Sequence, residues 1–344
     1  MEVSQLKADL EAGVEESLSN MDLADRELMI RKLQAVLDRQ YMLMMQTSLD
    51  NCTCPRCGQE KYSRYGFDKN RRQRYKCMSC GMIYTAASHA NLLSLSKLDI
   101  DVWKKYCECF VDGLSLRKSA DKCEVGLKTS LYMRRRILEL IHSHLPSFEI
   151  NPGSGVELDE TFFRESFKGN HKNSTMILPR PAYRHGGKHG KRGIGKEHIC
   201  VLCGASDSGD VFFDVACRGQ LNKNAARQVL GERICSGTIV STDRQKSYRS
   251  ALREINVACH NMFDDYEHKL PHVDNYHSIL KDFMHKFRGV STKWLYQYLT
   301  WHKWTISFRE EQLPILLKQI TSDRYKIRRR AIPNIKTVFA VETA

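Results

Sequence analysis

Apolar and acidic residues alternate along residues 156–163, Val-Glu-Leu-Asp-Glu-Thr-Phe-Phe, and this pattern predicts a β-strand. Because successive side chains of a strand point to opposite faces, Glu157, Asp159 and Thr161 share one face. Glu160 shares the other face with apolar neighbours. Taken alone, the stretch fits a solvated edge strand with ordinary surface acids as well as it fits a cation site, so the rest of the chain must decide.

The remaining hydrophobic pattern divides the chain into a helical N-terminal part and a C-terminal part that mixes strands and helices. The predicted helices of the first part span residues 22–46, 99–111, 116–123 and 128–144. A Pro- and Gly-rich stretch over 146–155 marks the boundary. Beyond it we expect strands over residues 198–203, 211–216, 237–243 and 257–259, and helices over 222–234, 246–254, 276–287 and 292–320. Cys200 and Cys203 lie inside one predicted strand and are interpreted as core thiols.

Two Cys-x-x-Cys pairs, Cys54/Cys57 and Cys77/Cys80, are separated by nineteen residues, and a glycine follows each pair. This spacing is typical of a zinc ribbon, in which two knuckles hold one tetrahedral Zn²⁺ through four thiolates. Cys52 is a fifth nearby thiol, either a spare ligand or a bystander. The chain has 13 cysteines and no signal-peptide pattern at its N-terminus, which favours metal ligands and buried thiols over disulfides.

A short helix over 116–123, a Gly-containing turn and a longer basic helix over 128–144 form the layout of a helix-turn-helix DNA-binding segment. The alternative is an ordinary helical bundle with a solvated basic face. Its position directly after a basic zinc ribbon favours DNA binding. The residues predicted to contact DNA here are Arg117, Lys128, Arg134, Arg135 and Arg136.

The net charge of +14 and a pI near 9.2 indicate a polyanionic partner. Residues 164–198 are rich in Lys, Arg, His and Gly, which predicts a long loop that orders on a phosphate backbone, with Lys168 among its contacts. A basic tail over 324–330 is a second candidate for phosphate contacts. No apolar run approaches the length of a transmembrane helix, so we expect a cytoplasmic, nucleoid-associated protein without a membrane partner.

Two more carboxylates follow the pattern of Asp159. Asp243 closes the predicted strand over 237–243, and Asp274 lies just ahead of a predicted helix. Carboxylates from neighbouring strand ends and one helix converge in sites for two Mg²⁺ or Mn²⁺ ions, since these cations prefer oxygen ligands. Such a metal pair promotes in-line phosphoryl displacement, which together with the DNA-binding segments suggests chemistry on nucleic acid.

The order of these motifs resembles the zinc-ribbon, DDE-type transposases of bacterial insertion sequences, over roughly residues 50–305. The resemblance rests on the four cysteines and on segments 113–120, 157–162, 165–170, 242–243, 277–281, 287–293 and 298–301. It implies an α/β fold, namely an RNase H-like mixed β-sheet flanked by helices and preceded by a zinc ribbon and a helix-turn-helix. It also implies two catalytic metal ions, cleavage of element ends and transfer of the 3′-OH strand into target DNA.

By position in these motifs, Asp159 and Asp243 resemble the first two metal ligands of the family. The third ligand is usually Glu, seven positions before a Lys. Counting back from Lys281 gives Asp274, a shorter acid. Seven residues are about two helical turns, so Lys281 would share a helix face with Asp274 and hold a DNA phosphate.

The third ligand position has two rivals, Asn275 and His277, whose alternative roles are helix capping and packing. Glu157 and Glu160 are further acids of the predicted catalytic strand; they are backup metal ligands, although a supporting or structural role is favoured.

These observations predict a DNA transposase with structural Zn²⁺ and catalytic Mg²⁺ or Mn²⁺, which binds double-stranded DNA as a homo-oligomer. The alternatives are a DNA-binding regulator with an inactive or repurposed catalytic domain, and a zinc-ribbon nuclease without strand transfer. The predicted segments are an N-terminal helical segment (1–50), the zinc ribbon (51–87), the helix-turn-helix domain (88–150), the catalytic domain (151–305) and a basic tail (306–344).

Overall fold

The computed structural model describes most of the chain. The described residues are 13, 16, 17, 21–49, 53–67, 73–85, 92, 96, 98–148, 150, 152–168, 193–263, 270–287 and 289–321. They separate into two compact units, with the division at Lys104 and Lys105. Most of the predicted basic loop, the basic tail and Cys52 lie outside the described residues.

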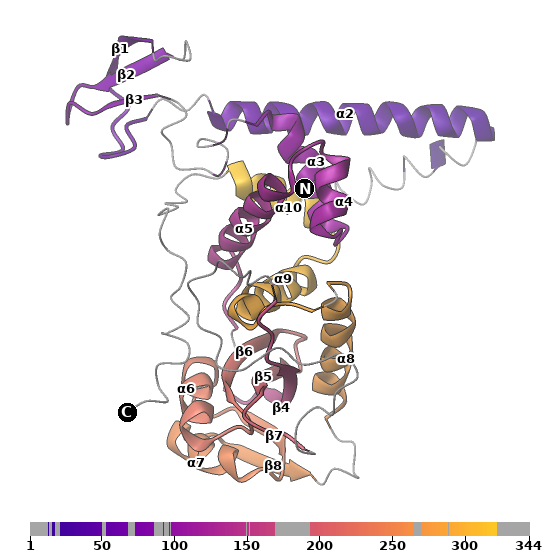
Figure 1. Ribbon diagram of the computed structural model, residues 1–344, viewed down its shortest axis with the longest axis vertical. Helices are drawn as coiled ribbons and strands as arrows, with labels where there is room; N and C mark the ends of the chain where they lie inside the picture. Colours follow the sequence, from indigo (N-terminus) through magenta and orange to yellow (C-terminus); the bar gives the residue numbers. More distant parts are fainter. Residues whose placement is uncertain are drawn as a thin grey trace. The chain divides into compact units, whose positions relative to one another are not determined.

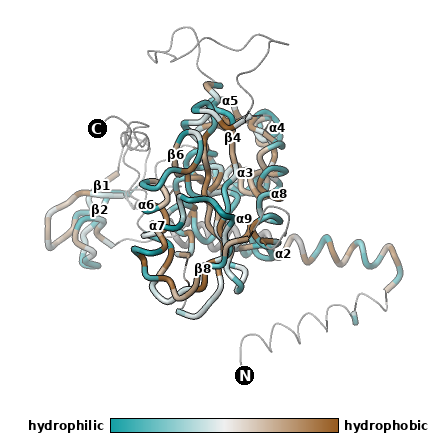
Figure 2. Tube along the Cα trace, turned by 90° about the horizontal axis from the view of Figure 1, so that it is seen from below, coloured by the Kyte–Doolittle hydropathy of each residue, from teal (hydrophilic) through white to brown (hydrophobic). Residues whose placement is uncertain are grey.

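The first unit contains a long helix and a small antiparallel sheet. Helix α2 (Leu23–Leu49) exposes several of its apolar side chains, and Figure 2 shows hydrophobic and hydrophilic residues alternating along it. The small sheet has the order β1-β2-β3, formed by β1 (Tyr62–Phe67), β2 (Gln73–Cys77) and β3 (Ile83–Thr85). Its core consists of the buried residues Cys54, Cys77 and Tyr84, with Tyr75, Cys80 and Met82 packed against them. A core this small leaves much of the stability to a bound metal.

Three helices precede the larger sheet: α3 (Ile100–Val111), α4 (Leu116–Lys122) and α5 (Leu127–Ser143). Ser115 caps α4 by accepting a hydrogen bond from the Lys118 backbone N–H, and α4 packs against α5. The turn between them contains Glu124 in a left-handed conformation (φ 54°). The predicted helical boundaries agree with the observed ones to within one residue.

The larger sheet has five strands in the order β6-β5-β4-β7-β8. Antiparallel pairing joins β4 to β5 and β5 to β6, whereas β4, β7 and β8 run parallel. This mixed sheet flanked by helices is the predicted RNase H-like α/β fold, and the prediction is confirmed. The strands are β4 (Gly155–Arg164), β5 (His198–Ser206), β6 (Val211–Arg218), β7 (Ile239–Asp243) and β8 (Cys259–Phe263).

One face of this sheet is covered by α6 (Lys223–Arg233) and α7 (Lys246–Ile255) (Figure 1). Val156, Leu158 and Val240 point to that face and share a core with both helices. The mixture of parallel strands and crossover helices explains why these strands are rich in apolar residues. Cys200 and Cys203 are both fully buried, as expected of core thiols.

The opposite face of the sheet carries α8 (Pro271–His285) and α9 (Leu295–Ser307), which pack on β4, β5 and β6. The short 3₁₀ helix η2 (Thr292–Trp294) leads into α9, and α10 (Gln312–Thr321) follows it. Three helices therefore replace the single helical stretch predicted over 292–320. The structure also moves the predicted strand over 257–259 to Cys259–Phe263, since Asn256 ends α7 in a left-handed conformation (φ 61°).

Aromatic packing joins α9 to the helices before the sheet. The Trp301 ring stacks on Phe110 with centroids 4.1 Å apart, and the Arg134 guanidinium lies over the same indole at 5.1 Å. Lys303 of α9 donates to the Pro146 carbonyl at 3.0 Å. Among the described helices, none combines the length and apolar character needed to cross a bilayer.

Candidate active site

Two parallel strands bring the first two predicted acids together. Leu158 of β4 pairs with Thr242 of β7, so the next residues, Asp159 in the middle of β4 and Asp243 at the end of β7, occupy neighbouring positions where the pairing of these strands ends. Paired residues of a parallel ladder point to the same face. Oxygen atoms of Asp159, Glu160 and Asp243 all lie within 4.8 Å of one another. Carboxylates are therefore clustered where the pairing of β4 with β7 ends.

Helix α8 brings further ligands to Asp159 from the other side. Ligand atoms of Asp159, Asp274 and His277 also lie within 4.8 Å of one another, and His277 Nδ1 is 3.5 Å from Asp159 Oδ2. Asp159 thus belongs to both groups. The structure brings all three predicted acids around this residue. His277, one of the two rivals for the third position, lies in the same cluster, whereas Asn275 is exposed on α8.

Glu157 has a role that the sequence did not reveal. Its Oε2 accepts hydrogen bonds from the backbone N–H groups of His272 and Val273 at 2.8 and 3.0 Å, and its Oε1 lies 2.8 Å from His272 Nδ1. Helix α8 has no side-chain cap of its own at Leu270. The carboxylate from β4 satisfies the free N–H groups of the first turn and complements the helix dipole. Glu157 therefore fixes the helix that carries Asp274.

Glu160 reaches the carboxylate group from the other face of β4. In the orientation that satisfies its neighbours, the Gln245 side-chain amide donates to both Glu160 oxygens at 3.0 and 2.9 Å. Burial raises the pKa of Glu160 to about 8, and the charges of Asp159 and Asp243 raise it further. A supporting role next to the ligands fits this arrangement, because the two Gln245 contacts already occupy the carboxylate.

Burial, and after it repulsion between carboxylates, determines the electrostatics of the site. Burial, followed by the charges of Asp243 and Asp274, raises the pKa of Asp159 to about 7, although Lys281 opposes this. Burial lowers the pKa of His277 to about 4, so its imidazole is neutral at physiological pH. Within the described residues, His277 Nε2 has no hydrogen-bond partner. The crowded carboxylate oxygens, with His277 Nδ1 beside them, are a donor set that a divalent cation would satisfy.

This donor set fits Mg²⁺ or Mn²⁺. The carboxylates supply the hard oxygen ligands that both ions prefer, and a neutral imidazole is a better ligand for Mn²⁺ than for Mg²⁺. Lys281 is exposed on α8, two turns from Asp274, where its charge acts on both Asp159 and His277. A cation placed beside the carboxylates is suited to hold a phosphate that approaches them.

The four predicted zinc ligands also converge. Their sulfurs all lie within 4.8 Å of one another, with Cys54 Sγ 3.5 Å from Cys80 Sγ and Cys57 Sγ 3.5 Å from Cys77 Sγ. A tetrahedral Zn²⁺ with Zn–S bonds of about 2.3 Å requires sulfur separations of about 3.8 Å. Backbone hydrogen bonds, chiefly at Cys80, lower the pKa of Cys77 to about 6, which favours the thiolate. The cluster is compatible with a zinc ribbon.

One predicted DNA contact on α5 is wrong. Arg134 is only 2% exposed; its Nη2 donates to the Leu114 carbonyl at 2.6 Å and to Ser119 Oγ at 3.2 Å. Its guanidinium also stacks on Trp301. The residue ties α5 to its neighbours instead of projecting toward DNA. Helical periodicity alone did not reveal this, because the partner indole lies far along the chain.

The other predicted DNA contacts fall into two groups, those that lie over aromatic rings and those that are exposed to solvent. Arg135 lies over the Trp294 ring at 4.2 Å, and Arg136 lies over Tyr132 and 3.7 Å from Glu139. Arg117, Lys128 and Lys168 are exposed, as is Lys281. These four cations remain the predicted phosphate contacts that solvent, and therefore DNA, can reach.

Comparison with known proteins found no matching protein-family model and no matching curated protein. Among solved structures, the chain is similar to the crystal structure of the mariner Mos1 paired-end complex with Mg, at 12% identity and a TM-score of 0.29, over 67% of this chain and 82% of that one. A pre-cleavage Mos1 transpososome gives 12% identity and a TM-score of 0.20 over 63% and 78%.

A third similar structure is the simian T-cell lymphotropic virus intasome in complex with PP2A regulatory subunit B56 gamma. It gives 12% identity and a TM-score of 0.26 over 52% of this chain, which spans 57% of the length of that one. At such TM-scores, the strand order and site geometry described above, and not these alignments, define the architecture.

Proposed function

We propose that the chain is a DDE-type DNA transposase that binds the ends of an insertion sequence, cleaves them and transfers the 3′-OH strand into target DNA. The observation that supports this most directly is the cluster of carboxylates around Asp159. Two parallel strands supply Asp159 and Asp243, and a helix from the opposite side supplies Asp274. The motif order that resembles insertion-sequence transposases gives the same assignment.

In this proposal Asp159, Asp243 and Asp274 hold two Mg²⁺ or Mn²⁺ ions, with His277 as a further ligand candidate. When bound, such a pair activates the attacking oxygen and stabilises the leaving oxygen of an in-line displacement at phosphorus. The protein supplies position: Glu157 holds the first turn of α8 in place, and Lys281 binds the phosphate next to the carboxylates.

DNA recognition in the proposal belongs to the segments before the catalytic sheet. The zinc ribbon is basic and aromatic, with Arg74 and Lys76 over the Tyr65 ring at 5.6 and 5.7 Å. Arg117 and Lys128 are exposed on the helix-turn-helix. The net charge of +14 supports a large phosphate contribution to affinity, which makes binding strongly salt-dependent.

The proposal is tested with the purified full chain, Mn²⁺ or Mg²⁺, and linear DNA that carries the inverted repeats flanking the gene. We expect nicking at the repeat ends and, with a supercoiled plasmid present, joined products. Asp159→Asn and Asp243→Asn should abolish nicking and retain binding to end DNA. Glu232→Gln, which removes an exposed acid of the same domain, should leave both unchanged.

Three results would contradict the proposal. Nicking that survives in Asp159→Asn would exclude the carboxylate group as its origin. Metal-dependent nicking without any joined product would instead indicate a nuclease, and binding without nicking would indicate a regulator.

A further inference from the structure

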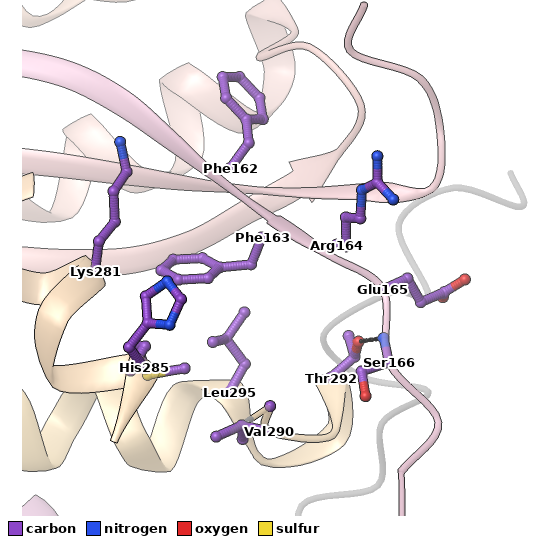
Figure 3. Close-up of a pocket in the computed structure, with 12 residues that line it drawn as sticks. Phe162, Phe163, Arg164, Glu165, Ser166, Lys281, His285, Val290, Thr292 and Leu295 are labelled. Carbon is purple, nitrogen blue, oxygen red and sulfur yellow. Dashed lines mark hydrogen bonds between the residues drawn. The ribbon is translucent and has the colours of Figure 1, made fainter. Parts of the chain in front are cut away.

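An apolar pocket of about 760 Å³ lies beside the carboxylates, between the end of β4 and helices α8 and α9. Phe163, Met284, Val290 and Leu295 supply its apolar wall. Figure 3 shows Phe163 directed from β4 toward His285 and Leu295, whereas Phe162 is directed to the opposite side of the strand. None of the functions assigned above uses this pocket.

The pocket is held open by contacts within its own wall. Ser166 N donates to Thr292 Oγ1 at 2.8 Å (Figure 3), and Thr292 N donates to the Ser166 carbonyl at 2.8 Å. These bonds join the end of β4 to the loop before α9. The one acid in the wall, Glu165, is paired with Arg218 at 2.5 Å, so its charge is compensated. The cavity is thus an apolar site with one wall fixed by hydrogen bonds.

The pocket is close to the proposed site of chemistry. Phe163 lies on the same face of β4 as Asp159, four residues further, which is about 13 Å along the strand. Lys281 stands at the edge of the pocket with its ammonium group directed away from the apolar wall (Figure 3). A phosphate held by Lys281 therefore lies between the carboxylates and the pocket.

A second, basic pocket of about 610 Å³ adjoins the apolar one, and Gly289 lines both. Its exposed cations are Arg117, Lys118, Lys168 and Lys286. The apolar pocket consequently has positive charge on two sides, from Lys281 and from this basic pocket. A ligand that matches this distribution is flat and apolar in its centre and anionic on both sides, which is the chemistry of one nucleotide within a strand.

We propose that the apolar pocket receives an unstacked nucleobase of the bound DNA, from a nucleotide adjoining the phosphate at the carboxylates. This inference rests on the proposed function and specifies how its DNA is held. The Phe163 ring and the imidazole of His285 offer aromatic surfaces on which a base stacks, and Lys281 and Lys286 hold the flanking phosphates. Capturing the base fixes the reacting phosphate in register with Asp159.

The test uses the fluorescent base 2-aminopurine, placed singly at each of the nucleotides on either side of the cleaved bond. Complexes with the full chain are measured without added Mg²⁺ or Mn²⁺, so that no cleavage occurs and the ribbon keeps its zinc. When the labelled base leaves the DNA double helix, it no longer stacks on the neighbouring bases, and its fluorescence changes strongly. We expect one position to respond in the wild type and in Ile279→Phe, which adds the same ring on α8 outside the pocket.

Two variants remove the site. Val290→Phe fills the pocket, and Phe163→Ala removes its stacking surface. Both should bind end DNA, lose the fluorescence response and cleave more slowly by about 5- to 150-fold, the range that one base–aromatic stack contributes. An abasic nucleotide at the responsive position should restore much of the rate of Val290→Phe, since no base then needs a pocket.

The inference is overturned if the wild type cleaves end DNA while no position responds, or if Val290→Phe cleaves intact DNA at the wild-type rate. In both cases the proposed function survives. Failure of the wild type to cleave in Mn²⁺ would overturn the proposed function, and this inference with it.

Discussion

We expect the cluster of carboxylates around Asp159 to make the metal-free protein less stable than a variant in which one of these acids is neutral. Asp159→Asn keeps the shape of the side chain and removes its charge. Burial and the neighbouring Asp243 and Asp274 raise the pKa of Asp159 from its ordinary 3.8 to about 7. Because the pKa is higher in the folded than in the unfolded state, the stabilisation provided by the protonated acid is complete below about pH 4 and is lost as the pH rises through 7.

The size of this effect follows from the pKa shift. At about 1.4 kcal/mol for each unit, the ionised Asp159 lowers the free energy of unfolding by about 4 kcal/mol above pH 7. The neutral amide of Asn still loses its hydration on burial, which cancels part of the gain. We therefore expect Asp159→Asn to raise the free energy of unfolding by about 2 kcal/mol at pH 8 in EDTA, and Tm by about 6 °C.

The assay is urea unfolding followed by tryptophan fluorescence. Trp294, Trp301 and Trp304 all lie in the unit that contains the site, and Trp301 and Trp304 are buried. Adding Mn²⁺ at about 100 times its Kd should stabilise the wild type by about 2.7 kcal/mol and the variant far less, so the order of stability reverses. Glu232→Gln should shift stability by less than about 0.5 kcal/mol in either condition.

A variant that is less stable than the wild type in EDTA at pH 8 would refute this reasoning. So would a wild-type stability that stays constant between pH 5 and pH 8. Either result would mean that burial and the neighbouring carboxylates do not raise the pKa of Asp159 in the folded protein.

Four further predictions concern the support of the site, the zinc ribbon and the DNA-binding helices. Glu157→Ala should lower the free energy of unfolding by about 1–2 kcal/mol, the value of a lost helix cap, and weaken Mn²⁺ binding measured by calorimetry. Cys57→Ser should abolish stoichiometric zinc measured by atomic absorption and make the ribbon protease-sensitive, while Cys259→Ser, at another exposed thiol, should not. Arg134→Lys should reduce stability by about 2 kcal/mol in urea, because lysine cannot keep both the carbonyl contact and the stacking on Trp301. Lys128→Ala should leave stability unchanged and reduce the salt slope of DNA binding by about 1.

The sequence was sufficient for the parts of the site that depend on local pattern. Asp159 alternates with apolar residues in one strand and Asp243 ends another, and parallel pairing of the two strands places both acids side by side. The spacing of Asp274 and Lys281 follows from helical periodicity. These features need no knowledge of contacts between distant segments, which explains why the fold class and the convergence of the acids could be predicted.

Other features depend on contacts between segments far apart in the chain. The sequence did not reveal what Glu157 supports, because its partner, the first turn of α8, lies 115 residues away. Arg134 looked like its neighbours in a basic run, but the aromatic surface that buries it comes from α9. The pocket at Phe163 likewise forms only when β4 meets the loop before α9. Hydrophobic periodicity predicts which face of a helix or strand is apolar, but it does not predict which other segment packs against that face.

The packing of α9 against α5 has a consequence for where DNA would be cut. Trp301 is held by Phe110 and Arg134, and Lys303 is hydrogen-bonded to the Pro146 carbonyl, so α4, α5 and the five-stranded sheet share one compact unit. If the chain acts as proposed, this unit fixes the distance between its DNA-binding helix and its cleavage site. The number of base pairs between the bases contacted by α5 and the bond cut at Asp159 is then a fixed property of the protein, and an end with one base pair inserted between them would be bound but cut out of place.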